Sequence, residues 1–315
     1  MNTDIETIKA RSAMYRAIRD FFDNRGYLEL ETPSLSSTLI PEPTIECFET
    51  AFINPYRAQK SFYLIPSPEL FMKPFIAATG RSVYQICKCF RNSEQLGFEH
   101  NPEFTMLEYY TVGYDEKDSI GLTKDLLSAV GIKQEIETMT MDQAFQDLAG
   151  FSFLECQKPS QIRQKAYEKG LGPFGPESWE DTFNRIFLTF VEPCLSKDHP
   201  VILTDYPRQI ECLAKNDGLV KRRWEMYIGG IEVANCYDEL TDVEQIRDVY
   251  ERETAILSQR LDTPIPDTDP DFATKLQGMK PCSGVAMGLD RLLMAILDKK
   301  DIKDLILFPF SDMLT

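Results

Sequence analysis

The strand-like segments of this sequence come mostly as neighbours that could form adjacent hairpins. The clearest pair lies in KRRWEMYIGGIEVANCYDEL (221–240), where Gly229 and Gly230 separate two runs rich in β-branched and aromatic residues. Further strand-like runs are SFYLIP (61–66), RSVYQICKCFRN (81–92), PEFTMLEYYTVGY (102–114), PVILTDYP (200–207) and SGVAMGLD (283–290). Strands in adjacent hairpins, with helices before and after them, favour an α+β fold with an antiparallel sheet over a doubly wound parallel sheet.

Helical patterns surround these strands. Residues 4–23 carry apolar side chains at helical spacing, with Asp4 as a candidate N-cap and residues 24–26 as a stop signal. Residues 116–200 have a different texture, because they combine helical patterns with Gly and Pro breaks in GLGPFGPES (170–178). We therefore expect a single domain over residues 1–315, with a small helical insertion over 116–200 between two halves of the sheet.

Composition limits the possible functions. The formal net charge of −16 over 315 residues argues against a protein whose whole surface tracks a phosphate backbone, but it does not exclude a local basic groove. The first residues are polar, and no apolar run approaches the roughly 18 residues of a membrane span, so we expect a cytoplasmic protein. The eight cysteines include no CxxC pair, which predicts reduced structural thiols.

Arginines are the candidate ligands for a nucleotide. The sequence has no GxGxxG and no GxxxxGK[ST], so side chains rather than a glycine-rich loop would hold the phosphates. Arg91 follows the apolar run VYQICKCF, where it could clamp a phosphate or form a salt bridge. Arg291 could be a second clamp or pair with Asp290, and spacing alone favours the pair. His100 could reach a terminal phosphate or be structural, and Phe104 could stack on adenine.

Two glutamates flank the Gly-Gly turn. In a hairpin, Glu225 and Glu232 would lie on neighbouring strands. Two carboxylates at such a short distance repel each other unless a hard cation neutralises them. Magnesium carried by a nucleoside triphosphate is the usual cation in such a site. Solvated hairpin glutamates are the alternative interpretation.

Carboxylates from two separate segments could hold a diamine. Ser67 and Glu69 open a loop beside an apolar surface, while Asn235 and Glu239 lie in the second half of the hairpin segment. Each carboxylate could bind one ammonium group, because a partly buried cation needs a charged partner.

Three segments together resemble the motifs of class II aminoacyl-tRNA synthetases, and specifically the catalytic core of lysyl-tRNA synthetase. RSAMYRAIRDFFDNRGYLELETP (11–33) is similar to motif 1, which serves dimerisation, FRNSEQLGFEHNPEF (90–104) to motif 2, and GVAMGLDRLLMAI (284–296) to motif 3. The motifs occur in order, and the similarity covers nearly the whole chain. The resemblance implies an ATP site that adjoins an amino-acid pocket.

The resemblance also implies roles for individual residues. Arg91 would bind the α-phosphate of ATP and Arg291 the γ-phosphate, and both would be catalytic. The other implied nucleotide contacts are His100, Asn101, Phe104, Glu232, Val233 and Gly288. The implied magnesium ligands are Glu225 and Glu232, and the implied amino-acid contacts are Ser67, Glu69, Tyr110, Asn235, Glu239 and Ala286.

Within that class, the chain resembles the elongation factor P lysine ligase family. The motif 1 segment begins close to Met1, so we expect no N-terminal anticodon-binding domain. Ala286 stands where the tRNA synthetase has glycine, and its methyl group could select the shifted amine of a β-amino acid. The resemblance implies activation of (R)-β-lysine or lysine as an adenylate, transfer to a lysine side chain of elongation factor P, and a homodimer.

Two alternatives stay open at this point. One is a lysine-activating enzyme that charges tRNA or a small acceptor, although the acidic net charge counts against tRNA. The other is a catalytically silent synthetase-like binding module, and the presence of Arg91, Arg291, Glu225 and Glu232 argues against silence.

The motif 2 segment departs from the synthetase pattern FRxE. Ser93 occupies the position of the glutamate, Glu94 follows it, and the loop to His100 is one residue longer. Either Glu94 takes over the role, or adenine and amine recognition differ. Arg208 and Glu211 also stand where smaller polar residues are expected in the wall of the amino-acid pocket.

Overall fold

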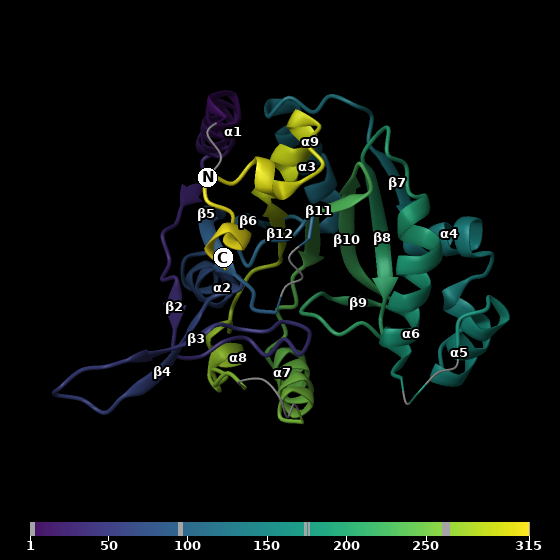
Figure 1. The fold of residues 1–315 in the computed structure, drawn as a ribbon. Helices are drawn as coiled ribbons and strands as arrows, with labels where there is room; N and C mark the ends of the chain where they lie inside the picture. Colours follow the sequence, from purple (N-terminus) through teal and green to yellow (C-terminus); the bar gives the residue numbers. More distant parts are fainter. Residues whose placement is uncertain (1–3, 94–96, 173–174, 176, 260–264, 315) are drawn as a thin grey trace.

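A large sheet forms the centre of the molecule (Figure 1). The computed structural model describes residues 4–93, 97–172, 175, 177–259 and 265–314. Within these ranges the sheet has nine strands. Eight pair in the spatial order β1 (Leu28–Glu29), β5 (Val83–Phe90), β6 (Glu103–Val112), β12 (Cys282–Gly288), β11 (Ile231–Asp238), β10 (Val220–Ile228), β8 (Val201–Pro207) and β7 (Glu137–Thr140), and β9 (Asn216–Asp217) pairs with β10.

The sheet is antiparallel through its body. Every pair from β5 to β8 is antiparallel, whereas β1 runs parallel to β5 and β7 runs parallel to β8 at the two edges. The predicted α+β antiparallel fold is therefore confirmed, with two parallel edge pairs in addition. The predicted hairpin is β10–β11, where Gly229 and Gly230 have φ of 65° and 84°, a conformation that glycine adopts without steric cost.

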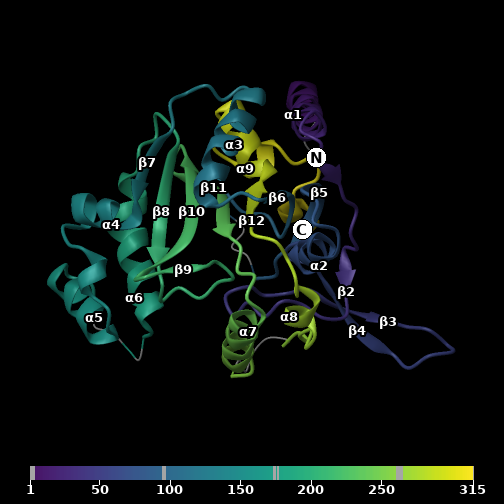
Figure 2. The ribbon, with the colours of Figure 1, turned by 180° about the vertical axis from the view of Figure 1, so that it is seen from behind.

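Three helices cover one face of the sheet: α1 (Ile5–Asp23), α3 (Glu116–Ala129) and α9 (Leu289–Leu297). Asp4 caps α1 as predicted, because its side chain accepts from the N–H groups of Glu6 and Thr7. Phe22 of α1 is fully buried and stacks on Tyr84 of β5, with 4.8 Å between the ring centres. The three helices gather at the same end of the molecule in both views (Figures 1 and 2).

The opposite face combines apolar packing with polar side chains. The helices α2 (Glu69–Thr79), α7 (Val243–Leu257) and α8 (Phe272–Lys275) pack around a smaller core on this side. Strand β6 shows the division, since Leu107 and Tyr109 belong to the core under α1, α3 and α9, whereas Tyr110 belongs to the smaller core. Because side chains alternate along a strand, Glu108 faces the same side as Tyr110.

A three-stranded sheet extends from the body beside this face. Its strands are β2 (Leu35–Ser36), β3 (Glu49–Phe52) and β4 (Lys60–Leu64), in the order β2-β4-β3. The β3–β4 hairpin projects outward in both views (Figures 1 and 2).

Part of the segment 116–200 has its own core. The helices α4 (Met141–Ala144), α5 (Pro159–Glu168) and α6 (Trp179–Ile186) surround Phe145 and Phe183, whose rings stack at 4.7 Å. In the same segment, α3 packs into the main core and β7 joins the main sheet. Shorter helical turns cover Phe145–Ala149, Phe153–Glu155, Phe187–Val191, Glu192–Cys194, Ile302–Asp304 and Phe310–Met313. Within the described ranges, none of the helices has the length and apolar character that crossing a membrane requires.

Candidate active site

The residues predicted to bind the nucleotide line one cavity. The cavity has a volume of about 190 Å³ and is bounded by β6, β11, β12 and the start of α9. Its walls include all eight residues of the implied nucleotide set, namely Arg91, His100, Asn101, Phe104, Glu232, Val233, Gly288 and Arg291. The fold therefore brings together side chains from the motif 2 segment, the β10–β11 hairpin and the motif 3 segment.

Arg91 lies directly after β5, as predicted. Its backbone N–H donates to the carbonyl of Pro102 at 2.9 Å, so pairing with the segment before β6 continues as far as the arginine. The guanidinium carbon lies 5.4 Å from the centre of the Phe104 ring, a distance at which the ring face attracts a cation. Arg91 and Phe104 therefore share one wall of the cavity.

Arg291 projects from the first turn of α9 into the same cavity. Its Nη1 donates to the carbonyl of Glu232 at 2.8 Å, and its Nε donates to the carbonyl of Glu99 at 3.3 Å. Its Nη2 lies 2.8 Å from Nε2 of His100. The guanidinium group is thus oriented by three acceptors from two other segments.

The pair between Arg291 and Asp290 that spacing alone favoured is not formed. Asp290 Oδ1 instead accepts from Nη1 of Arg11 in α1 at 2.7 Å, and its Oδ2 accepts from the N–H of Thr105 at 2.7 Å. Successive residues of α9 point in different directions, so Asp290 faces α1 and β6 while Arg291 faces the cavity.

Asn101 and Gly288 shape the cavity walls. The Nδ2 group of Asn101 donates to the carbonyl of Glu103 at 2.5 Å, and its Oδ1 accepts from the N–H of Phe310 at 3.1 Å. Asn101 thereby ties the C-terminal segment to β6. A Cβ on Gly288 would lie 3.8 Å from the carbonyl oxygen of Val233, so glycine leaves the wall one methyl group wider.

The two hairpin glutamates differ in their surroundings. Glu232 lines the cavity, and burial, followed by the charge of Glu225, raises its pKa to about 7. Glu225 Oε2 accepts from the hydroxyl groups of Tyr206 and Tyr227, each at 2.6 Å, and its Oε1 accepts from Arg223. The charges of the two carboxylates act on each other, as the hairpin interpretation predicted.

This carboxylate pair fits a divalent cation in part. Arg291 Nη1 lies 3.9 Å from Glu232 Oε2, yet burial and the charge of Glu225 still raise the pKa of Glu232, so a further cation would be favourable beside it. Glu225 already accepts three hydrogen bonds, and a carboxylate offers about four acceptor positions. In the described part of the chain, no three or more His, Cys, Asp or Glu side chains form a group suited to a metal ion. A magnesium ion here would therefore need further ligands from a bound nucleotide or water.

A buried carboxylate, Glu108, lies at the centre of a second polar group. Ser67 Oγ donates to Glu108 Oε1 at 2.5 Å, and the Tyr110 hydroxyl donates to Glu108 Oε2 at 2.9 Å. Burial, followed by the charge of Glu69, raises the pKa of Glu108 to about 8. Two of the implied amino-acid contacts, Ser67 and Tyr110, thus hold a glutamate that the sequence patterns did not single out.

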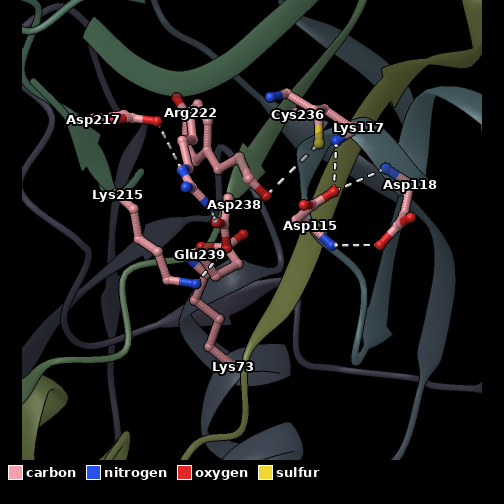
Figure 3. Close-up of polar contacts among 11 residues, drawn as sticks. Lys73, Asp115, Lys117, Asp118, Lys215, Asp217, Arg222, Cys236, Asp238 and Glu239 are labelled. Carbon is pink, nitrogen blue, oxygen red and sulfur yellow. Dashed lines mark hydrogen bonds and ion pairs between the residues drawn. The ribbon is translucent and has the colours of Figure 1, made fainter. Parts of the chain in front are cut away.

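Glu69 and Glu239 complete this group, which we call the carboxylate cluster (Ser67, Glu69, Lys73, Glu108, Tyr110 and Glu239). Lys73 Nζ donates to Glu69 Oε1 and lies 2.6 Å from Glu239 Oε2. Burial raises the pKa of Glu239 to about 7, although the charge of Lys73 acts in the opposite direction. Figure 3 shows Lys73 extending from α2 toward Glu239. Lys73 is not among the residues that the sequence predicted for the site, and its spacing of four residues from Glu69 on a helix was the available signal.

Asn235 and Ala286 lie between the nucleotide cavity and the carboxylate cluster. Ala286 pairs with Asn235 of β11 on one side and with Glu108 of β6 on the other. Both Asn235 and Ala286 also line the nucleotide cavity. The cavity and the carboxylate cluster are therefore adjacent on one face of the sheet, and the implied amino-acid contacts are divided between them.

The described residues that depart from the synthetase pattern lie in different parts of the structure. Ser93 adopts a φ of 58°, in the left-handed region that few non-glycine residues occupy. Glu94 lies outside the described residues. Arg208 and Glu211 line a different cavity of about 580 Å³, where Glu211 pairs with Arg252 of α7 at 3.2 Å.

Comparison with known proteins identifies the family. A sequence model of the family described as tRNA synthetases class II (D, K and N) matches residues 2–312. The elongation factor P–(R)-β-lysine ligase of Haemophilus ducreyi is 36% identical over 310 residues, which cover 96% of this chain and 94% of the relative. The chain belongs to this family of class II synthetase-like ligases. Ligases of the same name from Pectobacterium carotovorum and Vibrio vulnificus are 35% and 36% identical, over 98% and 97% of this chain and 96% of each relative.

Membership of the family bears on three predictions. It confirms the predicted resemblance, the class II synthetase fold and the assignment to the ligases. The mixed sheet flanked by helices agrees with that fold. The alternative of a catalytically silent binding module receives no support from these three relatives, each of which is named as a ligase.

Proposed function

We propose that this chain activates (R)-β-lysine, or lysine, with ATP as an aminoacyl-adenylate and transfers the aminoacyl group to a lysine side chain of elongation factor P. The names of the relatives support both the amino acid and the acceptor. The observation that carries the proposal is the contact between two unlike sites. A cavity with two arginines meets a buried carboxylate cluster at the paired residues Asn235 and Ala286.

A diamino acid needs both sites at once. Its ammonium groups need carboxylates in a buried setting, and Glu69, Glu108 and Glu239 supply them. Its own carboxylate must reach the α-phosphate of ATP, and the adjacent cavity holds the arginines that suit phosphates. We assign Ser67, Tyr110, Asn235 and Ala286 to the same amino-acid pocket.

In the proposed nucleotide site, Arg91 binds the α-phosphate and Arg291 the γ-phosphate. His100 and Asn101 lie toward the triphosphate and ribose, Phe104 lies under adenine, and Glu232, Val233 and Gly288 line the remaining wall. Glu232, with Glu225 as a second ligand, would hold magnesium, which supplies positive charge at the phosphates. The orientation of Arg291 by His100 and two carbonyl groups supports its role as a preset clamp.

The first step requires little proton transfer. The amino-acid carboxylate attacks the α-phosphorus in line, a new P–O bond forms, and the bond to pyrophosphate breaks. Arg91 and Arg291 stabilise the charge that develops on the phosphate oxygens, and the two sites hold the reacting groups in position. In the second step an uncharged lysine amine attacks the adenylate carbonyl and AMP leaves.

We further propose that residues 1–315 act as one catalytic domain, with an insertion inside 116–200 that consists of the part with its own core around α4, α5 and α6. The similarity of residues 11–33 to the dimerisation motif supports a homodimer. Because the proposed acceptor is a translation factor, we propose a cytoplasmic location. Charging of tRNA is the second candidate, since the matched family includes tRNA synthetases, but the net charge of −16 disfavours a nucleic-acid acceptor.

Amino-acid-dependent exchange between ATP and labelled pyrophosphate tests the activation step. We expect exchange with (R)-β-lysine or lysine and much weaker exchange with norleucine, which lacks the second amine. Glu239→Gln should weaken exchange with the diamino acids by raising their KM. Equal exchange with norleucine and the diamino acids would contradict the assignment of the carboxylate cluster to an amine.

A further inference from the structure

Lys73 places an ammonium group of the protein inside the carboxylate cluster. Lys73 is 2% exposed, so its side chain is enclosed by protein. It comes from the second turn of α2, four residues after Glu69. Its Nζ contacts Glu69 of the same helix and Glu239, which directly follows β11, so one ammonium group joins two elements that are distant in sequence.

The neighbouring carboxylate has cations of its own. Asp238, beside Glu239, pairs with Lys215 at 2.5 Å and with Arg222 at 3.3 Å. Figure 3 shows Lys215 and Arg222 directed at Asp238, and Lys73 approaching Glu239 from α2. The two adjacent carboxylates therefore pair with different cations: Lys73 pairs with Glu239, whereas Lys215 and Arg222 pair with Asp238.

The charges of the cluster do not balance without a ligand. Glu69, Glu108 and Glu239 carry three negative charges when ionised, and Lys73 supplies one positive charge, which leaves two negative charges. Glu42 also interacts with Glu69 and Lys73, and the positive charge of Arg91 offsets its negative charge. Burial raises the pKa of Glu108 to about 8 and that of Glu239 to about 7, as expected for carboxylates that lack full neutralisation. Two ammonium groups, the number that a diamino acid carries, would complete the balance.

We propose that Lys73 is a positioning residue of the amino-acid pocket, which ties Glu69 to Glu239 and sets the charge of the cluster to match a substrate with two ammonium groups. The inference rests on the proposed function, because it assumes that an amino acid binds at this cluster. Lys73 does not line the nucleotide cavity, so its effect is confined to the amino acid.

Loss of the Lys73 charge would disturb the pocket in a defined way. When the partly buried Glu69 and the buried Glu239 lose their shared cation, they repel each other, and they respond by moving apart or by binding protons. Glu239 would then leave its place beside Tyr110, and a proton on either carboxyl would compete with the substrate ammonium group. Both responses weaken amino-acid binding. The alternative is that the Lys73 ammonium group occupies the place of the substrate ammonium group and is displaced when the substrate binds. In that case, removal of the Lys73 charge would strengthen amino-acid binding.

The test compares KM for the diamino acid with KM for ATP in pyrophosphate exchange. Lys73→Met, which keeps the length of the side chain without its charge, should raise the amino-acid KM by about tenfold or more and leave the ATP KM within about twofold. Lys300→Met is the matched control, because Lys300 is 84% exposed and pairs only with Asp298 among the described residues. We expect the control to change neither KM.

Chemical rescue separates charge from packing. In Lys73→Ala, n-propylammonium should enter the space left by the lysine and lower the amino-acid KM, whereas n-propanol, of similar size and without charge, should not. Should Lys73→Met fail to fold, Lys73→Gln, which can still donate hydrogen bonds to the two carboxylates but carries no charge, takes its place. Its amino-acid KM should rise by about tenfold or more while the ATP KM stays within about twofold.

The outcomes distinguish the inference from the proposed function. The proposed function would be refuted if the wild type showed no exchange with any diamino acid. The positioning role of Lys73 would then be tested by calorimetry, which compares the affinity of the wild type and of Lys73→Met for the diamino acid. Equal affinities overturn the inference. Where the wild type is active, the inference is overturned by an unchanged or lower amino-acid KM, by a parallel rise of both KM values, or by equal rescue with n-propanol.

Discussion

Nη2 of Arg291 lies 2.8 Å from Nε2 of His100, although 191 positions separate the two residues in the sequence. Arginine only donates hydrogen bonds, so the imidazole nitrogen that faces it accepts and carries no proton. The contact joins α9 to the segment before β6 and closes one side of the nucleotide cavity. Together with the two backbone carbonyl acceptors, it sets the direction of the guanidinium group.

Loss of this contact should affect ATP more than the amino acid. We expect His100→Ala to raise the KM for ATP by about tenfold, because a hydrogen bond to a charged group contributes about 1.5–3 kcal/mol. The amino-acid KM should stay within about twofold in the same exchange assay. His199→Ala is the matched control, since His199 pairs with Glu137 at 2.9 Å outside the cavity. Equal ATP KM values for His100→Ala and the control would argue against the clamp.

Arg91→Ala should reduce the rate of pyrophosphate exchange by about 100-fold or more, because a preset donor at the reacting phosphate is lost. The circular dichroism spectrum and the melting temperature should stay close to those of the wild type. Arg91→Lys should recover little activity, since an ammonium group does not reproduce a two-point contact with phosphate. Arg57→Ala, in the exposed turn of the β3–β4 hairpin, serves as control. Undiminished exchange by Arg91→Ala would refute the role of Arg91.

Gly284 should be intolerant of substitution for a reason specific to the amino-acid pocket. A Cβ at this position would overlap Oε1 of Glu239 and lie 2.5 Å from Cε1 of Tyr110. Gly284→Ala should therefore displace both side chains and raise the amino-acid KM by about tenfold or more, with calorimetric ATP binding preserved. In Gly121→Ala, the new methyl group meets open space on α3 and should leave both affinities unchanged. An unaltered amino-acid KM in Gly284→Ala would place the pocket elsewhere.

Amino-acid binding should strengthen as pH rises from 6 to about 8.5. Burial raises the pKa of Glu108 to about 8 and that of Glu239 to about 7, so both carboxyls bind protons in the free enzyme at pH 6. The groups that act on them include Ser67, Glu69, Lys73, Tyr110 and, beside Glu239, Asp238. An ammonium group binds the ionised form, so binding at low pH must release protons.

The measurement is the diamino-acid KM between pH 6 and 8.5, which should fall through the range from 7 to 8. Glu108→Gln removes the group with the higher pKa, and it should flatten the change near pH 8 while it weakens binding. A KM that is constant over this range, or that rises with pH, would contradict the assignment of these carboxyls to the substrate amine.

The sequence motifs predicted a shared location for the implied nucleotide contacts better than for the implied amino-acid contacts. Arg91, Phe104 and Arg291 stand at the ends of strongly patterned elements, and their motif positions indicate a shared site. The structure brings all eight implied residues to one cavity. Pattern alone predicted the wrong partner for Arg291, because the contact of Asp290 with Arg11 depends on the packing of α1 against α9.

The carboxylate cluster shows what the sequence could not reveal. Glu108 lies in a run of apolar residues that is typical of a core strand, and only the burial of its side chain beside Ser67 and Tyr110 makes it a candidate contact for an amine. Lys73 pairs with Glu239, which is 166 positions away, so no local pattern indicates the contact. In the fold, the hairpin β10–β11 followed from two glycines, whereas the place of β12 between β6 and β11 depends on tertiary packing.

The most direct test of the account is a transfer assay with labelled (R)-β-lysine or lysine, ATP and magnesium, in which elongation factor P and bulk tRNA are offered in parallel. The account predicts label on a lysine side chain of elongation factor P, seen as a mass increase of one peptide, and none on tRNA. Elongation factor P in which the acceptor lysine is replaced by arginine should stay unlabelled. Label on tRNA alone, or adenylate formation without transfer to elongation factor P, would contradict the account.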